Sequence, residues 1–320
     1  MSLRLAILEL AASRRLAPAG ARRLLQLAGV GSEPARLPAV LPRAIAVLAA
    51  VLGGFGVLLW VAASWADFGR GGRFALLQAL VFTMGIGAWW LPRARAPLGL
   101  AALLAIGGLF AYFGQTYQTG ADAWQLFALW AAIGLPLALA VRSDVVWVPW
   151  AVVATTGIVL WSGGAPSPWR GHVDVGRQVT GWAAAIALVL AAAPAWRRVT
   201  GAGPWAMRTA AALAVCTVTL SALVALFGPG REGLYVAGLA VLVVAAVLLA
   251  LPAWHDLFAL SAVALGLDTL VVGGLARWLF GDGRGDWLGT FGLLGLLAAG
   301  VLAATVQAVM RVAAARRAGP

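Results

Sequence analysis

Ten long apolar blocks, separated by short stretches that contain Arg, Gly, Pro or Asp, constrain this chain more than any other feature. A helix needs about 20 apolar residues to cross a hydrocarbon core about 30 Å thick. The sequence therefore predicts an all-α fold, a polytopic transmembrane helical bundle of about ten membrane helices. Short connections make each helix antiparallel to the next. The expected spans are 44–64, 73–91, 97–114, 122–141, 144–161, 179–196, 206–227, 233–251, 255–279 and 288–310.

The composition excludes a water-soluble fold. Of the 320 residues, 62% are hydrophobic and 11% are charged, and the mean hydropathy is +0.93. Soluble domains carry about 25% charged residues, so this chain lacks the polar side chains to cover a surface in water. We expect the lipid bilayer to be its surrounding.

The positive charge also fits a membrane protein. The formal net charge is +12, and all 23 basic residues are Arg, placed in short runs between apolar blocks. Arginines in such places anchor helix ends at the membrane surface, whereas a nucleic-acid interface gathers them on one face. We expect no nucleic-acid partner. The single Cys216 excludes a disulfide within the chain, and His172 and His255 are too far apart for a local metal motif, so no metal and no cofactor are expected.

The arginines further predict an orientation. With ten spans, sixteen of the 23 arginines fall on the side of the two termini and seven on the opposite side. Cytoplasmic segments carry the excess of Lys and Arg, so both termini should be cytoplasmic. Tryptophans lie near the expected helix ends, for example Trp60 and Trp161 at outer ends and Trp89 and Trp205 at inner ends. This placement is typical of the two aromatic belts of a membrane protein.

The first 42 residues differ from the rest. "LRLAILELAASRRL" and "PAGARRLLQLAG" both indicate short amphipathic helices, with Pro18 at a helix start and Gly29 at a helix end. This pair either lies on anionic lipid through its arginines or forms a solvated helical hairpin. The sequence thus predicts a cytoplasmic helical segment and linker (1–42), a transmembrane helical domain (43–311) and a cytoplasmic tail (312–320).

A polar island, "AYFGQTYQTGADAWQLF" at residues 111–127, interrupts the apolar chain. The topology places it at the outer turn between the third and fourth helices. Gly120 suits the positive φ that follows a helix end. Asp122 is placed to cap the next helix, and Gln125, three residues on, completes a variant of the capping box. Those roles leave Gln115, Thr116, Gln118 and Thr119 without an explanation, so the island is either a capped turn or a functional site.

The island also carries a resemblance. "GQTYQTGADAWQLFALWA" is similar to the signature of a bacterial membrane family, domain of unknown function 2157, whose members carry Gly-Gln-x-Tyr-Gln-Thr-Gly-Ala-Asp followed by Trp-Gln-Leu-Phe. The resemblance covers about the first half of the chain, and Ser64 departs from it where Asn is expected. It implies a bacterial cytoplasmic membrane and no particular activity. The motif residues are Gly114, Gln115, Tyr117, Gln118, Thr119, Gly120, Asp122, Trp124 and Gln125.

Asp268 is the one carboxylate deep inside an expected span. It lies twelve residues after Asp256, which is about 18 Å of helix, and Thr83, Thr155, Thr156 and Thr217 fall at a similar depth. A carboxylate at the midplane is costly and is often functional. Asp268 either takes part in proton-coupled transport or is a structural residue that faces the bundle interior and bonds Thr217, Thr219 or a backbone group.

Three functions are compatible with these residues. The first is a non-enzymatic accessory or scaffolding component of a membrane complex, which implies another membrane protein as partner. The second is a proton-coupled transporter or channel that uses Asp268. The third, an enzyme with an outer-face site at Tyr117–Asp122, is disfavoured because no catalytic set of side chains lies close in sequence. A water-filled cavity that reaches Asp268 favours transport, whereas a sealed contact between Asp268 and Thr favours the scaffold.

Cysteine labelling tests the predicted topology. Arg15→Cys should react with an impermeant thiol reagent only from the cytoplasmic side, and Thr119→Cys only from the opposite side, because an excess of arginine stays in the cytoplasm. Labelling of the two positions from the same face, or in the reverse pattern, contradicts it.

Overall fold

The computed structural model describes residues 3–14, 16–28, 37–63, 69–117, 120, 122–163, 174–228, 231–251, 254, 256–281 and 287–317. The chain divides into two compact units, Met1–Ala49 and Ala50–Pro320. The first unit contains α1 (Leu3–Ser13), α2 (Pro18–Leu27) and the first part of α3 (Leu37–Ala63). Pro18 occupies the first turn of α2, as predicted, because proline suits the first helical position. Gly29 lies outside the described residues.

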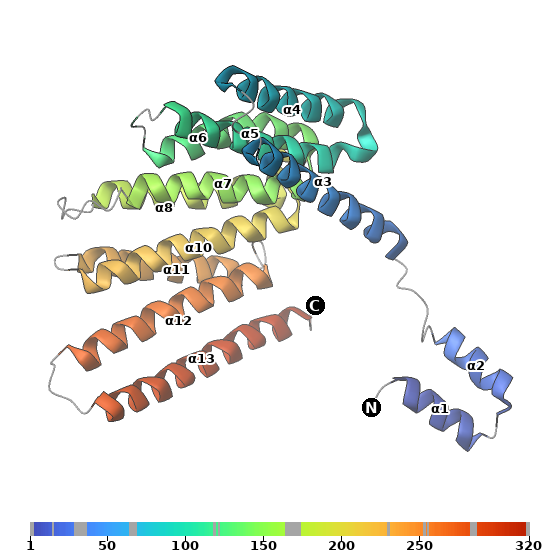
Figure 1. Ribbon diagram of the computed structural model, residues 1–320. Helices are drawn as coiled ribbons and strands as arrows, with labels where there is room; N and C mark the ends of the chain where they lie inside the picture. Colours follow the sequence, from blue (N-terminus) through green and yellow to red (C-terminus); the bar gives the residue numbers. More distant parts are fainter. Residues whose placement is uncertain are drawn as a thin grey trace. The chain divides into compact units, whose positions relative to one another are not determined.

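The second unit is a helical bundle (Figure 1). Its helices are α4 (Arg70–Trp90), α5 (Arg95–Tyr117), α6 (Ala123–Val141), α7 (Asp144–Gly163), α8 (Val175–Ala191), α9 (Arg197–Thr200), α10 (Pro204–Phe227), α11 (Glu232–Ala250), α12 (Leu257–Phe280) and α13 (Trp287–Arg317), with two short 3₁₀ turns, η1 (Pro92–Ala94) and η2 (Pro194–Trp196). No strand occurs in the described part of the chain. The predicted all-α polytopic bundle is confirmed.

The described helices account for nearly all the expected spans. Nine are long and apolar enough to cross a bilayer, and up to ten if α8 and the η2–α9 segment, which meet at 55°, form one broken span. Three bounds differ from the prediction by more than four residues. Helix α3 begins at Leu37, since Pro38 is tolerated in a first turn. Helix α8 ends at Ala191 because Pro194 cannot continue it, and α13 runs to Arg317, into the expected tail.

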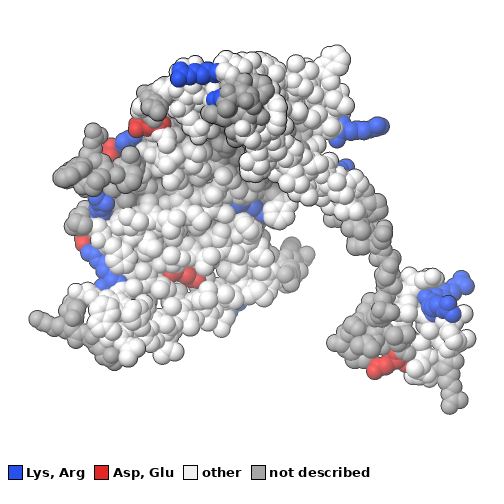
Figure 2. Space-filling view, in the orientation of Figure 1, with Lys and Arg blue, Asp and Glu red and all other residues white. Residues whose placement is uncertain are grey.

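Helix α10 lies at the centre of the second unit, packed against α7, α8, α11 and α12, while α13 packs on α12. The largest buried side chains around α10 come from these neighbours, and Leu270 of α12 and Ala222 of α10 are fully buried. On the visible face, charged side chains gather mainly at the left edge, where connections between helices lie, and the helix flanks are mostly white with isolated red and blue patches (Figure 2). Such flanks suit contact with lipid.

Polar side chains join neighbouring helices across the bundle. Trp130 of α6 shows the pattern: its Nε1 donates to the Leu103 carbonyl of α5 at 2.9 Å, and a Cβ at Gly107 would overlap its ring, so glycine permits the approach. Four other pairs of neighbouring helices are joined by a comparable hydrogen bond. They are Trp150 Nε1 to Ala131 O at 2.8 Å, Trp182 Nε1 to Ser221 Oγ at 2.8 Å, Tyr235 OH to Leu270 O at 2.9 Å, and Thr305 Oγ1 to Asp268 Oδ1 at 2.7 Å.

Asp144, the first residue of α7, holds the start of α10. Its Oδ1 accepts from the backbone N–H groups of Gly203 at 2.7 Å and Ala206 at 3.3 Å, and its Oδ2 accepts from Trp205 at 3.1 Å. The first amides of a helix have no partner within the helix, and a carboxylate there also complements the helix dipole. Asp144 is not among the site residues predicted from the sequence.

These bonds place the starts of α7 and α10 at one end of the bundle, here called the Asp144 end. Arg208 of α10 pairs with Asp256 beside the start of α12 at 3.2 Å, so α12 begins at this end too. Helix α8 starts beside the far end of α7, since the Arg177 guanidinium lies 5.3 Å from the Trp161 ring. The chain must therefore return along α8 to reach α10. The far end, where α11 begins, is called the Arg231 end.

Replacing Asp144 tests this clamp. Asp144→Ala leaves three backbone N–H groups without their acceptor, so we expect the free energy of unfolding in detergent to fall by about 2–3 kcal/mol. The control is Glu232→Ala, which breaks an ion pair with Arg277 whose side chains are 66% and 38% exposed and should cost less than about 1 kcal/mol. Thermal unfolding followed by tryptophan fluorescence measures both, and equal losses would contradict the clamp.

Candidate functional site

The family-like motif forms the turn between α5 and α6. Helix α5 ends at Tyr117, Gly120 has φ of 65°, as expected after a helix end, and Asp122 occupies the position before α6 with extended backbone. Gln118 and Thr119 lie outside the described residues. Gly114, Gln115 and Gln125 are exposed. A methyl group at Gly114 would only touch Leu126 at 3.7 Å, so this glycine is not required by packing.

The predicted side-chain cap at Asp122 is wrong. In residues 122–163, which the structure describes, the Asp122 carboxylate caps no backbone N–H of α6. Its Oδ2 instead accepts from the indole Nε1 of Trp124 at 3.3 Å. The backbone N–H of Gln125 donates to the main-chain carbonyl of Asp122 at 3.0 Å and not to its carboxylate, so the capping box is not formed. The Trp124 indole, two residues further along the chain, therefore replaces the backbone N–H groups of α6 as the donor to this carboxylate.

Aromatic packing fixes the end of α5 against α4. Tyr117 is 52% exposed, and its ring stacks on Phe74 of α4 with centroids 5.8 Å apart. Tyr112, one and a half turns earlier, is buried, and its ring lies 4.7 Å from Phe74. The described motif side chains therefore stand on a rigid aromatic base and project outward. They offer a surface for contact and do not converge on a pocket.

Asp268 is buried between α12 and α13, with 8% of its surface exposed. Its Oδ1 accepts from Thr305 Oγ1 at 2.7 Å, and its Oδ2 has no partner among the described residues. The predicted contact with Thr217 or Thr219 is wrong. Thr219 faces Gly266, where an added methyl would lie 2.7 Å from the Thr219 Oγ1. Asp268 follows Gly266 by two residues, which is a rotation of about 200° around the helix, so its side chain points away from Thr219.

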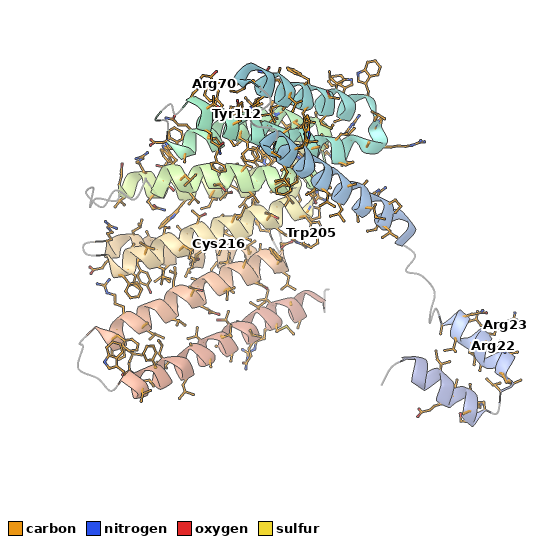
Figure 3. All side chains as sticks on the ribbon, in the orientation of Figure 1. Arg22, Arg23, Arg70, Tyr112, Trp205 and Cys216 are labelled. Atoms are coloured by element: carbon orange, nitrogen blue, oxygen red, sulfur yellow. The ribbon has the colours of Figure 1, made fainter. Side chains whose placement is uncertain are left out.

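Three of the expected midplane threonines do come together, at a cavity away from Asp268. Thr155 and Thr156 of α7 and Thr217 of α10 line a cavity of about 490 Å³, and Thr83 on α4 is not part of it. Cys216, labelled in Figure 3, lies on α10 at the same cavity. The other lining residues are Val159, Leu160, Ser162, Gly163, Gln178, Leu213, Leu220, Ser221, Val224, Ala225, Arg231 and Leu234, from α7, α8, α10 and α11.

Gln178 is not among the site residues predicted from the sequence, although the sequence holds a signal for it. Gln178, Gly181, Trp182 and Ala185 follow the spacing of one helix face, and all four are buried. A glutamine on the inward face of an apolar helix is costly unless it has a partner. Arg231 is not among the predicted site residues either, because many arginines of this sequence lie in connections between helices.

No group of three metal-ligating side chains occurs among the residues that the structure describes. His172 and His255 lie outside them. The candidate sites are therefore three: the exposed motif turn, the buried Asp268–Thr305 contact and the cavity at the Arg231 end.

Comparison with known proteins agrees with the membrane fold. Residues 9–147 match the model of a family described as predicted membrane protein (DUF2157). The match confirms the resemblance that the motif at Gly114–Phe127 carries, and it includes the whole motif turn. No curated protein and no solved structure matches the chain.

Two substitutions at Asp268 separate a structural role from a proton-carrying one. Asp268→Asn keeps an oxygen that accepts from Thr305, so we expect little change in the free energy of unfolding. Asp268→Leu removes the acceptor and should cost about 1–2 kcal/mol, as expected for a hydrogen bond between membrane helices. Thermal unfolding in detergent measures both variants. If Asn destabilises as much as Leu, the contact depends on the negative charge and the structural interpretation is contradicted.

Proposed function

We propose that this protein is a non-enzymatic accessory or scaffolding component of a membrane assembly in the bacterial cytoplasmic membrane. The observation that carries the proposal is the hydrogen bond from Thr305 to the buried Asp268, which joins α13 to the bundle. A proton-carrying group needs access to water. The Asp268 carboxylate is buried, and one of its oxygens accepts a hydrogen bond from the neighbouring helix. The cavity of about 490 Å³ does not have Asp268 among its lining residues.

The other polar contacts support the same interpretation. The indoles of Trp130, Trp150 and Trp182 each bond a neighbouring helix. Side chains of this kind are structural when they fasten helices and functional when they line a pathway. An enzyme at Tyr117–Asp122 is less well supported, because Tyr117 and Asp122 are exposed and their described contacts are aromatic stacking and one indole bond.

The proposal includes the orientation with both termini in the cytoplasm. Two observations support it. Sixteen of the 23 arginines lie on the side of the termini if there are ten spans. The return of the chain along α8, which the Asp144 contacts and the Arg177–Trp161 contact require, favours ten spans over nine. An even number of spans leaves both termini on one side.

The motif turn is the proposed contact with the partner. It presents Gln115 and Tyr117 to the outside on a base held by Phe74. The turn lies in the segment that matches the family model. Rigid, exposed polar and aromatic side chains lose little conformational entropy on binding and are typical of contact surfaces.

Purification of the tagged protein from its native membrane in mild detergent tests this function. We expect a partner membrane protein at fixed stoichiometry that remains in one peak on size-exclusion chromatography and recovers this protein when the partner is tagged. Gln115→Ala should reduce the recovered partner, whereas the matched control Gln307→Ala, on the exposed surface of α13, should not. Elution of the protein alone, together with pH-driven uptake in proteoliposomes that Asp268→Asn abolishes, would favour the transporter.

A further inference from the structure

The cavity at the Arg231 end has two unlike sides. Its outward side is apolar and open, with Val159, Leu220 and Val224 exposed at 41%, 61% and 65%. Its floor carries buried polar residues, among them Gln178 and Ser162, each 5% exposed. Because the flanks of α7 and α10 face the apolar surroundings, the cavity is a groove that opens sideways toward lipid.

Gln178 supplies a polar group that the described protein does not use. The residue is 95% buried, since 5% of its surface is exposed, and its side-chain amide makes no hydrogen bond to any residue in the described ranges. The amide can donate two hydrogen bonds and accept others. A buried amide without a partner is costly, so a ligand atom in the groove is its natural partner. Gln178 lies in the first turn of α8, near the Arg231 end.

The deeper part of the groove is apolar despite its hydroxyl groups. Thr217 Oγ1 donates to the Leu213 carbonyl at 2.8 Å, and Thr156 Oγ1 donates to the Val152 carbonyl at 2.8 Å. Threonines that bond their own helices in this way present their methyl groups to a neighbour. Along α10 the groove runs from Leu213 to Val224, which is about 16 Å of helix. One leaflet of the hydrocarbon core is about 15 Å thick, so the groove is as deep as one leaflet.

Positive charge lies at the shallow end. Arg231 lines the groove, and Arg177 precedes Gln178 on α8. A guanidinium beside a polar amide at headgroup depth favours a phosphate.

We propose that this groove binds one phospholipid with an anionic headgroup. The phosphate lies at Arg231, Gln178 bonds the ester region below it, and one acyl chain runs along Val159, Leu220 and Val224 toward the midplane. A groove of about 490 Å³ falls within the volume of ordinary ligand sites. This site is independent of the proposed assembly role, because it lies on α7, α8, α10 and α11 and not on the motif turn.

Cys216 provides the measurement, since it is the only cysteine of the chain and lines the groove. The rate of its reaction with N-ethylmaleimide is followed in mild detergent, with phosphatidylglycerol, phosphatidylcholine or glycerol phosphate added. We expect phosphatidylglycerol to slow labelling by about tenfold and phosphatidylcholine to slow it much less, since tenfold corresponds to about 1.4 kcal/mol of binding preference. Glycerol phosphate, a headgroup without chains, should have no effect.

Variants locate the headgroup. Arg231→Gln should abolish the preference for phosphatidylglycerol, Arg231→Lys should retain it, and Gln178→Leu should weaken protection by both lipids. Arg70→Gln, at an exposed arginine on α4, is the matched control and should behave as the unmodified protein. Circular dichroism and size-exclusion chromatography establish that each variant is folded. Equal protection by the two lipids in the unmodified protein, which needs no variant, would overturn the proposal. So would protection by glycerol phosphate alone, or an unchanged preference in Arg231→Gln.

Discussion

The structure depends on one constraint: within a bilayer, a polar group without a partner is costly, so most polar groups are matched within the protein. Helices satisfy their own backbones, which leaves their ends and their side chains to be matched. The Asp144 carboxylate accepts three hydrogen bonds from backbone N–H groups at the start of α10, although Asp144 belongs to α7. Asp174 and Asp256 do the same for the starts of their own helices, α8 and α12. Three of the seven carboxylates that the structure describes are thus placed where helix amides need an acceptor.

The clamp at the Asp144 end and the groove at the Arg231 end are related. Contacts of Asp144, and the ion pair of Arg208 with Asp256, hold α7, α10 and α12 together where these helices begin. The groove is lined by residues from the other halves of α7 and α10, from Thr155 and Leu213 onward. The groove therefore lies toward the ends of α7 and α10 opposite these contacts, and Gln178 is one of the polar residues on its floor.

Much of the fold could be predicted from the sequence, because apolar length alone identifies a membrane helix. The blocks at 122–141 and 144–161 correspond closely to α6 and α7. Periodicity also shows which residues share a face. It does not show which helix that face meets. For this reason the predicted partner of Asp268 was wrong, since the observed partner, Thr305, lies on α13 and far from Thr217 in the chain.

The motif turn shows a second limit of sequence patterns. Asp122 stands where a cap was expected, yet its carboxylate bonds the Trp124 indole. A capping pattern gives positions along the chain, whereas the choice among competing donors depends on side-chain geometry. Two threonines show the same competition. Thr217 donates to a carbonyl of its own helix, whereas Thr305 donates to Asp268 of a neighbouring helix. The second hydrogen bond fastens α13 to α12.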